Sequence, residues 1–256
     1  MWNSEIYNKF GKERLQPSID LLNRVDINTC NRIIDIGCGS GMSTLPLRKR
    51  FPSSEIIGID LSENMLESAK HLMEDVTWIK RDCSKKLNDL GAFDLVFSNA
   101  FLQWVDNQSE FIMNTKELLV ENGVFAIQVP AFEEMEIAQI IKEMAAEFNK
   151  EKKVFNNMDQ SLCYNYSLRE YYDMFTRHYS KVEIWQTNYI HQMKDQHSII
   201  EFIKGTALLP YLQRLNDTEA KDFLDRIYLK TKQSYPQSEN GSVLFEFKRL
   251  FIIARR

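Results

Sequence analysis

Long hydrophobic runs are absent from this sequence: nowhere do about 18 apolar residues follow one another, the length that a membrane-spanning helix needs. The first residues, Met1–Glu5, are polar and acidic and lack the basic and apolar regions of a secretory signal. We therefore expect a cytoplasmic protein that neither enters nor crosses a membrane.

Cysteine is scarce too, and the few cysteines are far apart. None of them forms a CxxC pair and no paired histidines lie near them, which argues against a bound metal. Reduced thiols in the cytosol fit this pattern best. The four cysteines are Cys30, Cys38, Cys83 and Cys163.

The sequence also lacks a large excess of charge of either sign. Its 32 Lys and Arg residues against 36 Asp and Glu residues give a net charge of −4. No overall field would gather nucleic acid, so a nucleic-acid partner is disfavoured, although a local basic pocket remains compatible with this balance.

What the sequence does contain is a glycine turn between two short hydrophobic segments. Ile33–Gly41 places apolar residues and Asp35 ahead of Gly37, Gly39 and Gly41. Glycines allow positive φ angles and a close approach of backbone N–H groups to a ligand. The next hydrophobic segment ends at Asp60, about 20 residues on, where an acid can accept both hydroxyls of a ribose.

This spacing distinguishes two kinds of nucleotide site. Met42 stands where a dinucleotide-binding fold would have its third glycine, which disfavours a nicotinamide dehydrogenase. A chance glycine-rich turn is the simplest alternative, but the acid at Asp60 makes it a poor explanation. The pattern favours a nucleotide-binding turn other than the nicotinamide-binding one.

Short segments rich in strand-forming residues alternate with amphipathic segments, which predicts parallel strands joined by helices. We expect a helix that Ser62 caps and another over Ser109–Val120 that ends at Asn122-Gly123. The expected strands are Arg32–Ile36, Glu55–Ile59, Val76–Lys80, Phe93–Ser98, Val124–Val129, Val182–Ile190 and Val243–Ala254.

Two stretches interrupt this alternation, residues 131–177 and residues 194–241, and both are helical in composition. We expect them to form a helical cap at the carboxyl ends of the strands, where open α/β sheets bind ligands. No Gly/Ser linker separates them from the rest, so residues 1–256 should form a single domain.

Polar residues also follow the third and fourth expected strands. Asp82 could accept the amine of adenine while the backbone of Cys83 meets a ring nitrogen, although an Asp here is commonly a turn cap. Asn99 and Ala100 would lie near the amino-acid part of a cofactor. Acids or polar groups at four successive strand ends favour S-adenosyl-L-methionine (SAM) as the ligand.

These motifs resemble those of the class I SAM-dependent methyltransferases, and further blocks across nearly the whole chain resemble the trans-aconitate 2-methyltransferase family. The glycine motif marks the superfamily, and the other blocks mark the family. The matching segments are Asp35–Gly41, Gly58–Ser62, Phe93–Trp104, an aromatic set from Trp2 to Pro17, Tyr189–His191, Phe202–Thr206 and Arg249–Arg256.

The resemblance implies a Rossmann-like, seven-stranded, mostly parallel α/β sheet whose last two strands pair antiparallel at its edge. It also implies SAM as cofactor and S-adenosyl-L-homocysteine as product. The expected cofactor contacts are Asp35, Gly37, Cys38, Gly39, Gly41, Asp60, Leu61, Asp82, Cys83, Asn99, Ala100 and Gln103.

By the same resemblance, the substrate is a small polycarboxylate such as trans-aconitate, which requires cations on a slightly acidic protein. Snorkelling surface charges and ordinary hydrophobic anchors are the competing interpretations for several of its contacts, and His191 could equally be a structural histidine. The expected substrate contacts are Trp2, Tyr7, Phe10, Arg14, Trp104, Tyr189, His191, Lys204 and Arg249.

The expected reaction is methyl-ester formation on a carboxylate. A carboxylic acid is ionised at neutral pH, so no catalytic base is needed, and proximity and orientation suffice. Two alternatives stay open: a methyltransferase for a fatty-acid-like or carrier-bound carboxylate, and a SAM-binding module without catalysis.

Overall fold

The computed structural model describes residues 11–155 and 165–256. Its centre is a seven-stranded sheet in the order β3-β2-β1-β4-β5-β7-β6. The strands are β1 (Arg32–Ile36), β2 (Glu55–Asp60), β3 (Thr77–Lys80), β4 (Phe93–Asn99), β5 (Leu119–Pro130), β6 (Lys181–Met193) and β7 (Val243–Arg255).

The first five strands run parallel to one another, whereas β7 pairs antiparallel with both β5 and β6. The predicted mostly parallel sheet with an antiparallel pair at its edge is therefore confirmed. β6 is the outermost strand, and β7 lies between it and β5. Their pairing runs along all thirteen residues of each strand.

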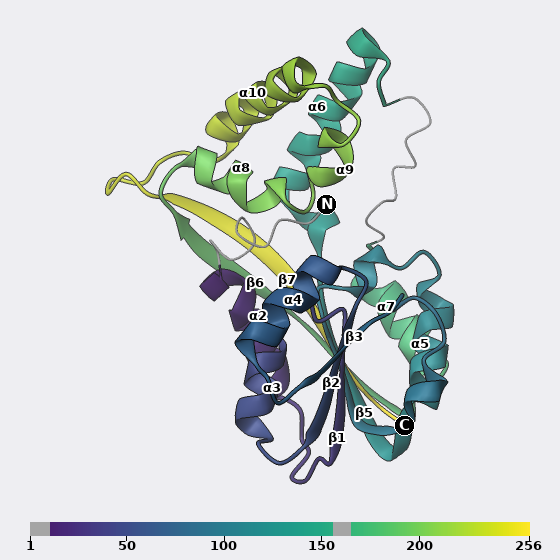
Figure 1. The fold of residues 1–256 in the computed structure, drawn as a ribbon. Helices are drawn as coiled ribbons and strands as arrows, with labels where there is room; N and C mark the ends of the chain where they lie inside the picture. The colour runs from purple at the N-terminus through teal and green to yellow at the C-terminus, as the bar shows by residue number, and fades with distance from the viewer. Residues whose placement is uncertain (1–10, 156–164) are drawn as a thin grey trace.

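Helices cover both faces of the sheet and one end of it (Figure 1). The structure describes α2 (Gly11–Asn23), α3 (Thr44–Arg50), α4 (Glu63–Leu72), α5 (Gln108–Glu117), α6 (Glu136–Lys152), α7 (Leu168–Thr176), α8 (Gln196–Lys204), α9 (Leu209–Leu212) and α10 (Asp217–Ser234), with short 3-10 turns at η1 (Asn88–Leu90), η2 (Leu102–Trp104) and η3 (Phe132–Glu134).

The two faces of the sheet carry separate hydrophobic clusters because strand side chains alternate between faces. On one face, Ile33 of β1 packs with Leu21 of α2 and Leu47 of α3. On the other face, Phe125 of β5 packs with Phe175 of α7 at a ring-centroid distance of 5.6 Å. This double burial explains why the central strands read as nearly continuous apolar runs.

The expected cap segment 131–177 divides between two places. Its α6 lies beyond the end of the sheet with α8, α9 and α10, whereas α7 lies beside α5 on the face of the sheet (Figure 1). A third apolar cluster holds the cap together, with Phe148 of α6 and Phe223 of α10 at a ring-centroid distance of 5.3 Å. Phe245 of β7 belongs to this cluster, so the long last strand ties the cap to the sheet.

Two local predictions were wrong. Ser62 occupies the N-cap position of α4 but makes no side-chain capping bond, and its backbone N–H donates to Asp60 instead. The helix expected to run to Val120 ends at Glu117, because Leu119 already pairs with Phe93 in the sheet. Asn122 (φ +62°) and Gly123 therefore lie within β5, where the register of the pair shifts.

Candidate active site

A cavity of about 440 Å³ opens at the carboxyl ends of the parallel strands. The glycine turn after β1 and the ends of β2, β3 and β4 form one wall, and Leu209, Pro210 and Gln213 of the cap lie on the other. This is the edge at which open α/β sheets bind their ligands, and the volume falls in the usual range for small-molecule sites.

The three motif glycines have positive φ angles but different surroundings. A Cβ on Gly37 (φ +72°) would lie 2.4 Å from the ring of Phe101, and a Cβ on Gly41 (φ +81°) would lie 3.0 Å from Trp78. At Gly39 (φ +54°) no atom of the described residues, its two chain neighbours aside, lies within 4 Å of the Cβ position. Gly37 and Gly39 line the cavity and Gly41 does not, so the open face of the turn is at Gly39.

Asp60 holds this turn in place from the tip of β2. Its carboxylate accepts hydrogen bonds from the backbone N–H of Gly39 at 2.9 Å and of Ser62 at 2.8 Å. Asp60 lines the cavity, as does Leu61, whose side chain is exposed at the rim. A carboxylate fixed by backbone donors presents its remaining acceptor capacity in a defined direction.

Asp35 lies behind the turn rather than in the cavity, so the structure does not place it among the cofactor contacts. It is completely buried and accepts hydrogen bonds from the hydroxyls of Thr44 at 2.6 Å and Ser43 at 2.9 Å. Burial raises the pKa of the Asp35 carboxyl to about 6, and the two hydroxyl bonds work against that rise. Asp35 therefore fastens the glycine turn to the start of α3.

Asp82 and Cys83 both line the cavity after β3. Asp82 is exposed and accepts bonds from the backbone N–H and the hydroxyl of Ser84, which lower the pKa of its carboxyl. Burial raises the pKa of the Cys83 thiol to about 12 and that of Cys38, which also lines the cavity, well above its ordinary value. Both thiols are therefore protonated at neutral pH and act as small apolar groups.

A second, smaller chamber of about 90 Å³ adjoins this cavity. The residues that border both spaces are Arg14, Asn99, Ala100 and Trp104. Gln103 lines only the smaller chamber, where its amide Nε2 donates to the carbonyl of Ala100 at 2.8 Å. Ala100 itself has a left-handed backbone (φ +58°), which is uncommon for a residue with a Cβ.

Arg249 and Arg14 bring two guanidinium groups to this chamber. Arg249 of β7 is only 6% exposed, lies with its guanidinium carbon 4.4 Å from the ring centre of Phe247 and donates to Gln128 Oε1 at 3.3 Å. Arg14 of α2 lies 4.9 Å from the ring centre of Phe202 and donates to the carbonyl of that residue at 2.9 Å.

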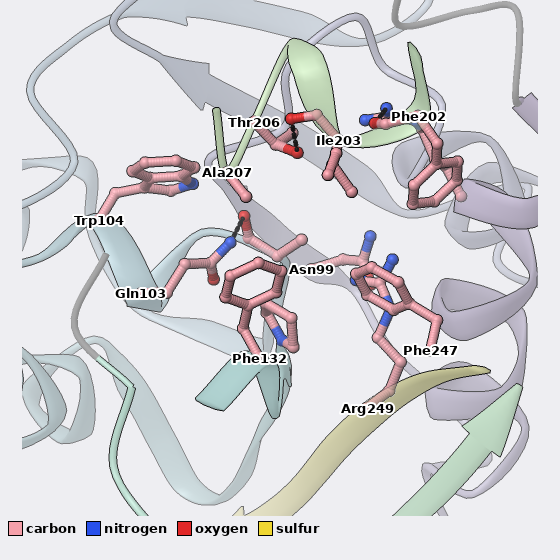
Figure 2. Close-up of a pocket in the computed structure, with 13 residues that line it drawn as sticks. Asn99, Gln103, Trp104, Phe132, Phe202, Ile203, Thr206, Ala207, Phe247 and Arg249 are labelled. Carbon is pink, nitrogen blue, oxygen red and sulfur yellow. Dashed lines mark hydrogen bonds between the residues drawn. The ribbon is translucent and has the colours of Figure 1, made fainter. Parts of the chain in front are cut away.

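The other walls of the chamber are mostly apolar, and Figure 2 shows Arg249 and Phe247 side by side on β7, with Phe202, Ile203, Thr206 and Ala207 above them. Among the described residues that line the chamber there is no Asp, Glu or His. The chamber therefore combines positive charge with mostly apolar walls, and in such surroundings an arginine binds a carboxylate strongly.

Three expected substrate contacts lie outside both spaces. Tyr189 donates from its hydroxyl to Asp20 at 2.6 Å. His191 is buried beside Phe202 and Phe247, and this burial, with the Arg249 charge second, lowers the pKa of His191 to about 4. Lys204 is exposed at the end of α8, and Thr206, two residues on, lines the chamber in its place.

Several lining residues were missed by sequence reasoning. Met42, treated as a missing glycine, borders the larger cavity, and Phe132, Ile203 and Leu209 come from the cap segments. Apolar side chains of a cap carry no motif that separates a cavity wall from a core. Trp2, Tyr7 and Phe10 were also expected at the site and lie outside the described residues.

Among residues 11–155 and 165–256 there is no cluster of three or more His, Cys, Asp or Glu side chains arranged to hold a metal ion. Within the same ranges, no helix has the length and hydrophobicity to cross a membrane. Cys30, Cys38 and Cys83 are buried and free.

Comparison with known proteins shows which proteins share this fold. A family model described as a methyltransferase domain matches residues 27–201. The YcgJ protein of Bacillus subtilis has a similar structure, with a TM-score of 0.61, 16% identity, and 94% of this chain and 98% of that chain covered. A phosphoethanolamine N-methyltransferase 2 of Haemonchus contortus, in complex with S-adenosyl-L-methionine, has a TM-score of 0.55 and 18% identity, with 93% of this chain and 52% of that chain covered. The fold and the cavity define a class I methyltransferase that uses SAM.

Curated relatives narrow this class. A trans-aconitate 2-methyltransferase of Escherichia coli O157:H7 (strain EC4115 / EHEC) is 36% identical over 255 residues, which cover 100% of this chain and 98% of the relative. An enzyme of the same name from Enterobacter sp. (strain 638) is 34% identical with the same coverage. The chain belongs to the trans-aconitate 2-methyltransferase family.

The described residues fit the cofactor of this family. Among the described residues, none beyond its chain neighbours fills the Cβ position of Gly39, and Asp60 lines the same cavity with its carboxylate fixed by backbone donors. The cavity is large enough for a nucleoside with an amino-acid tail. It shares Arg14, Asn99, Ala100 and Trp104 with the chamber that Arg249 lines, so a reactive group beside these residues would face both spaces.

Proposed function

We propose that this enzyme methylates one carboxylate of trans-aconitate, or of a closely similar small polycarboxylate, and releases a methyl ester and S-adenosyl-L-homocysteine. The observation that carries the proposal is Arg249, a buried cation in a chamber that shares wall residues with the cofactor cavity. The names of the curated relatives point to the same substrate.

For the cofactor, we assign the ribose to Asp60 and the adenine to Asp82 and the backbone of Cys83. The backbone at Gly37, Cys38 and Gly39 would face the amino-acid tail, and Asn99 and Ala100 would lie next to the sulfur. These assignments rest on the order of the strand ends along the cavity. We assign Gln103 to the support of Ala100, whose carbonyl accepts a hydrogen bond from Gln103 Nε2.

For the substrate, we assign the carboxylates that do not react to Arg249 and Arg14. Each guanidinium is already oriented by an aromatic ring and a hydrogen-bond acceptor, so less conformational entropy is lost when an anion binds. Phe132, Phe247 and Trp104 keep water away from the paired charges.

The chemistry needs little from the protein besides this arrangement. A bound cofactor would supply an electrophilic methyl group: the carboxylate oxygen bonds to the methyl carbon, and the sulfonium sulfur leaves as the neutral thioether of S-adenosyl-L-homocysteine. Because a carboxylic acid has a reference pKa near 4, the nucleophile is already ionised at neutral pH and no side chain has to remove a proton. The two arginines and the apolar walls orient the acid, so the catalysis is by proximity and orientation.

The size and charge of the chamber argue against the runner-up substrate. A fatty-acid-like or carrier-bound carboxylate requires a long apolar tunnel, whereas this small chamber has two guanidinium groups, of Arg14 and Arg249, in its wall. A module that binds SAM without catalysis would have no use for a buried arginine beside the cofactor cavity. We also propose that residues 1–256 form one domain, because residues of the cap line both spaces.

The test is a transfer assay with methyl-labelled SAM and a panel of acids. The panel holds trans-aconitate, other di- and tricarboxylates, short monocarboxylates and a long-chain fatty acid. We expect alkali-labile label in the polycarboxylates, with trans-aconitate the best of them. Label only in the monocarboxylates or the fatty acid would contradict the substrate, and label in no acid would contradict the reaction.

A further inference from the structure

Gln128 connects the two sides of the proposed active site without lining either cavity. It is fully buried on β5, in register with Asn99 of β4 and Phe251 of β7. Its side-chain Oε1 accepts a hydrogen bond from Arg249 Nη1 at 3.3 Å. Its backbone carbonyl accepts one from the N–H of Ala100 at 2.9 Å.

The orientation of this amide is fixed by its partner. A guanidinium carries only donors, so the oxygen of Gln128 and not its nitrogen must face Arg249. The Nε2 of Gln128 is then buried, and no other described residue accepts a hydrogen bond from it. An apolar side chain of the same size would avoid this unmet donor, so the amide lowers the stability of the fold.

A neutral acceptor has an advantage over a charged one at this position. It orients the guanidinium through one N–H and adds no negative charge beside it. A carboxylate in the same place would form a buried ion pair with Arg249 and compete with the substrate for it. The amide at this position is therefore explained by its effect on Arg249 and not by a contribution to the stability of the fold.

We infer that Gln128 is a positioning residue that aims Arg249 at the non-reacting carboxylate of the substrate. This inference rests on the proposed function for its substrate but concerns a residue that does not touch the substrate. Gln128 acts only through Arg249, so its removal should matter only while Arg249 is present.

Two substitutions separate positioning from space filling. Gln128→Met keeps the length of the side chain and removes the acceptor, and we expect the KM for trans-aconitate to rise about 10-fold. Gln128→Glu keeps the shape and adds a competing charge, so its KM should rise further, by about 100-fold. The KM for SAM should change less than about twofold in both variants.

The matched control is Gln196→Met in the cap. Gln196 is also a buried glutamine, and its Nε2 donates to the carbonyl of Tyr235 at 2.8 Å, away from both cavities. We expect this control to keep both KM values. In the Arg249→Met background, adding Gln128→Met should leave the KM for trans-aconitate unchanged, because the group that Gln128 positions is gone.

Several results would overturn the inference. These are a Gln128→Glu enzyme with wild-type KM, equal increases of both KM values, or an additive effect in the double variant. A crystal structure of Gln128→Met or Gln128→Glu tests the inference without any substrate: a guanidinium of Arg249 that keeps its place over Phe247 contradicts it, and a displaced one supports it. Failure of the proposed substrate would instead show in the wild type, as absence of transfer to trans-aconitate.

Discussion

Replacing Arg249 by methionine tests the chamber most sharply. The guanidinium is 6% exposed, so solvent screens its attraction to an anion only weakly. Loss of one charge-assisted pair costs about 1.5–3 kcal/mol, which corresponds to a rise of about 10- to 100-fold in the KM for trans-aconitate. The affinity for SAM should stay nearly unchanged, because Arg249 borders only the smaller chamber.

The control for this prediction is Lys248→Met, one residue away on the same strand. Lys248 donates to the carbonyl of Glu134 at 3.1 Å and lines neither space. Steady-state kinetics at saturating SAM, with calorimetric binding of S-adenosyl-L-homocysteine, compare the two variants. Wild-type KM in Arg249→Met, or equal losses in both variants, would refute the chamber as the carboxylate site.

Three further predictions concern the glycine turn and its supports. Asp60→Asn should raise the Kd for SAM by about 10- to 100-fold in calorimetry, because a charge-assisted acceptor is lost; a Kd within twofold of wild type would rule out the ribose assignment. Gly39→Val should melt at a lower temperature than the wild type, because φ +54° strains any side chain, but it should still melt cooperatively and should lose the rise in Tm that SAM produces. Gly37→Val should melt lower still without any ligand, because its Cβ would also lie 2.4 Å from Phe101. A normal SAM-induced shift in Gly39→Val would exclude close approach at that residue. Because folding raises the pKa of Asp35 from 3.8 to about 6, the folded state binds the extra proton, and this group reduces stability as the pH rises from 4 to 7. Asp35→Asn should match the wild type near pH 4 and exceed it by up to about 3 kcal/mol at pH 7 in denaturant unfolding; a difference independent of pH would contradict this pKa.

The sheet and the cofactor side of the site were predictable because both follow from local patterns. Strands at Arg32–Ile36 and Glu55–Asp60 are short apolar runs that end in the glycine turn and Asp60, and parallel strands bring such ends to one edge. Asp35 shares the motif but points away from the cavity. A motif gives the spacing of its residues, whereas their direction depends on packing against Ser43 and Thr44.

The substrate side was harder because it is assembled from segments far apart in the chain. Arg14 of α2, Thr206 after α8 and Arg249 of β7 meet at one chamber, and only tertiary packing brings them together. Lys204 was expected there, but α8 turns this residue to the surface. No sequence pattern predicted a role for Gln128, because the role of a single amide in an apolar strand depends on the arginine that packs beside it in the fold.

The measurement that tests the central claim most directly compares trans-aconitate with crotonate as methyl acceptors for the wild-type enzyme. Crotonate has one carboxylate on an unsaturated chain and lacks the carboxylates assigned to Arg249 and Arg14. Since each of the two pairs contributes about 1.5–3 kcal/mol, kcat/KM should be at least about 100-fold higher for trans-aconitate. Equal kcat/KM values for the two acids would mean that the arginines of the chamber do not select the substrate.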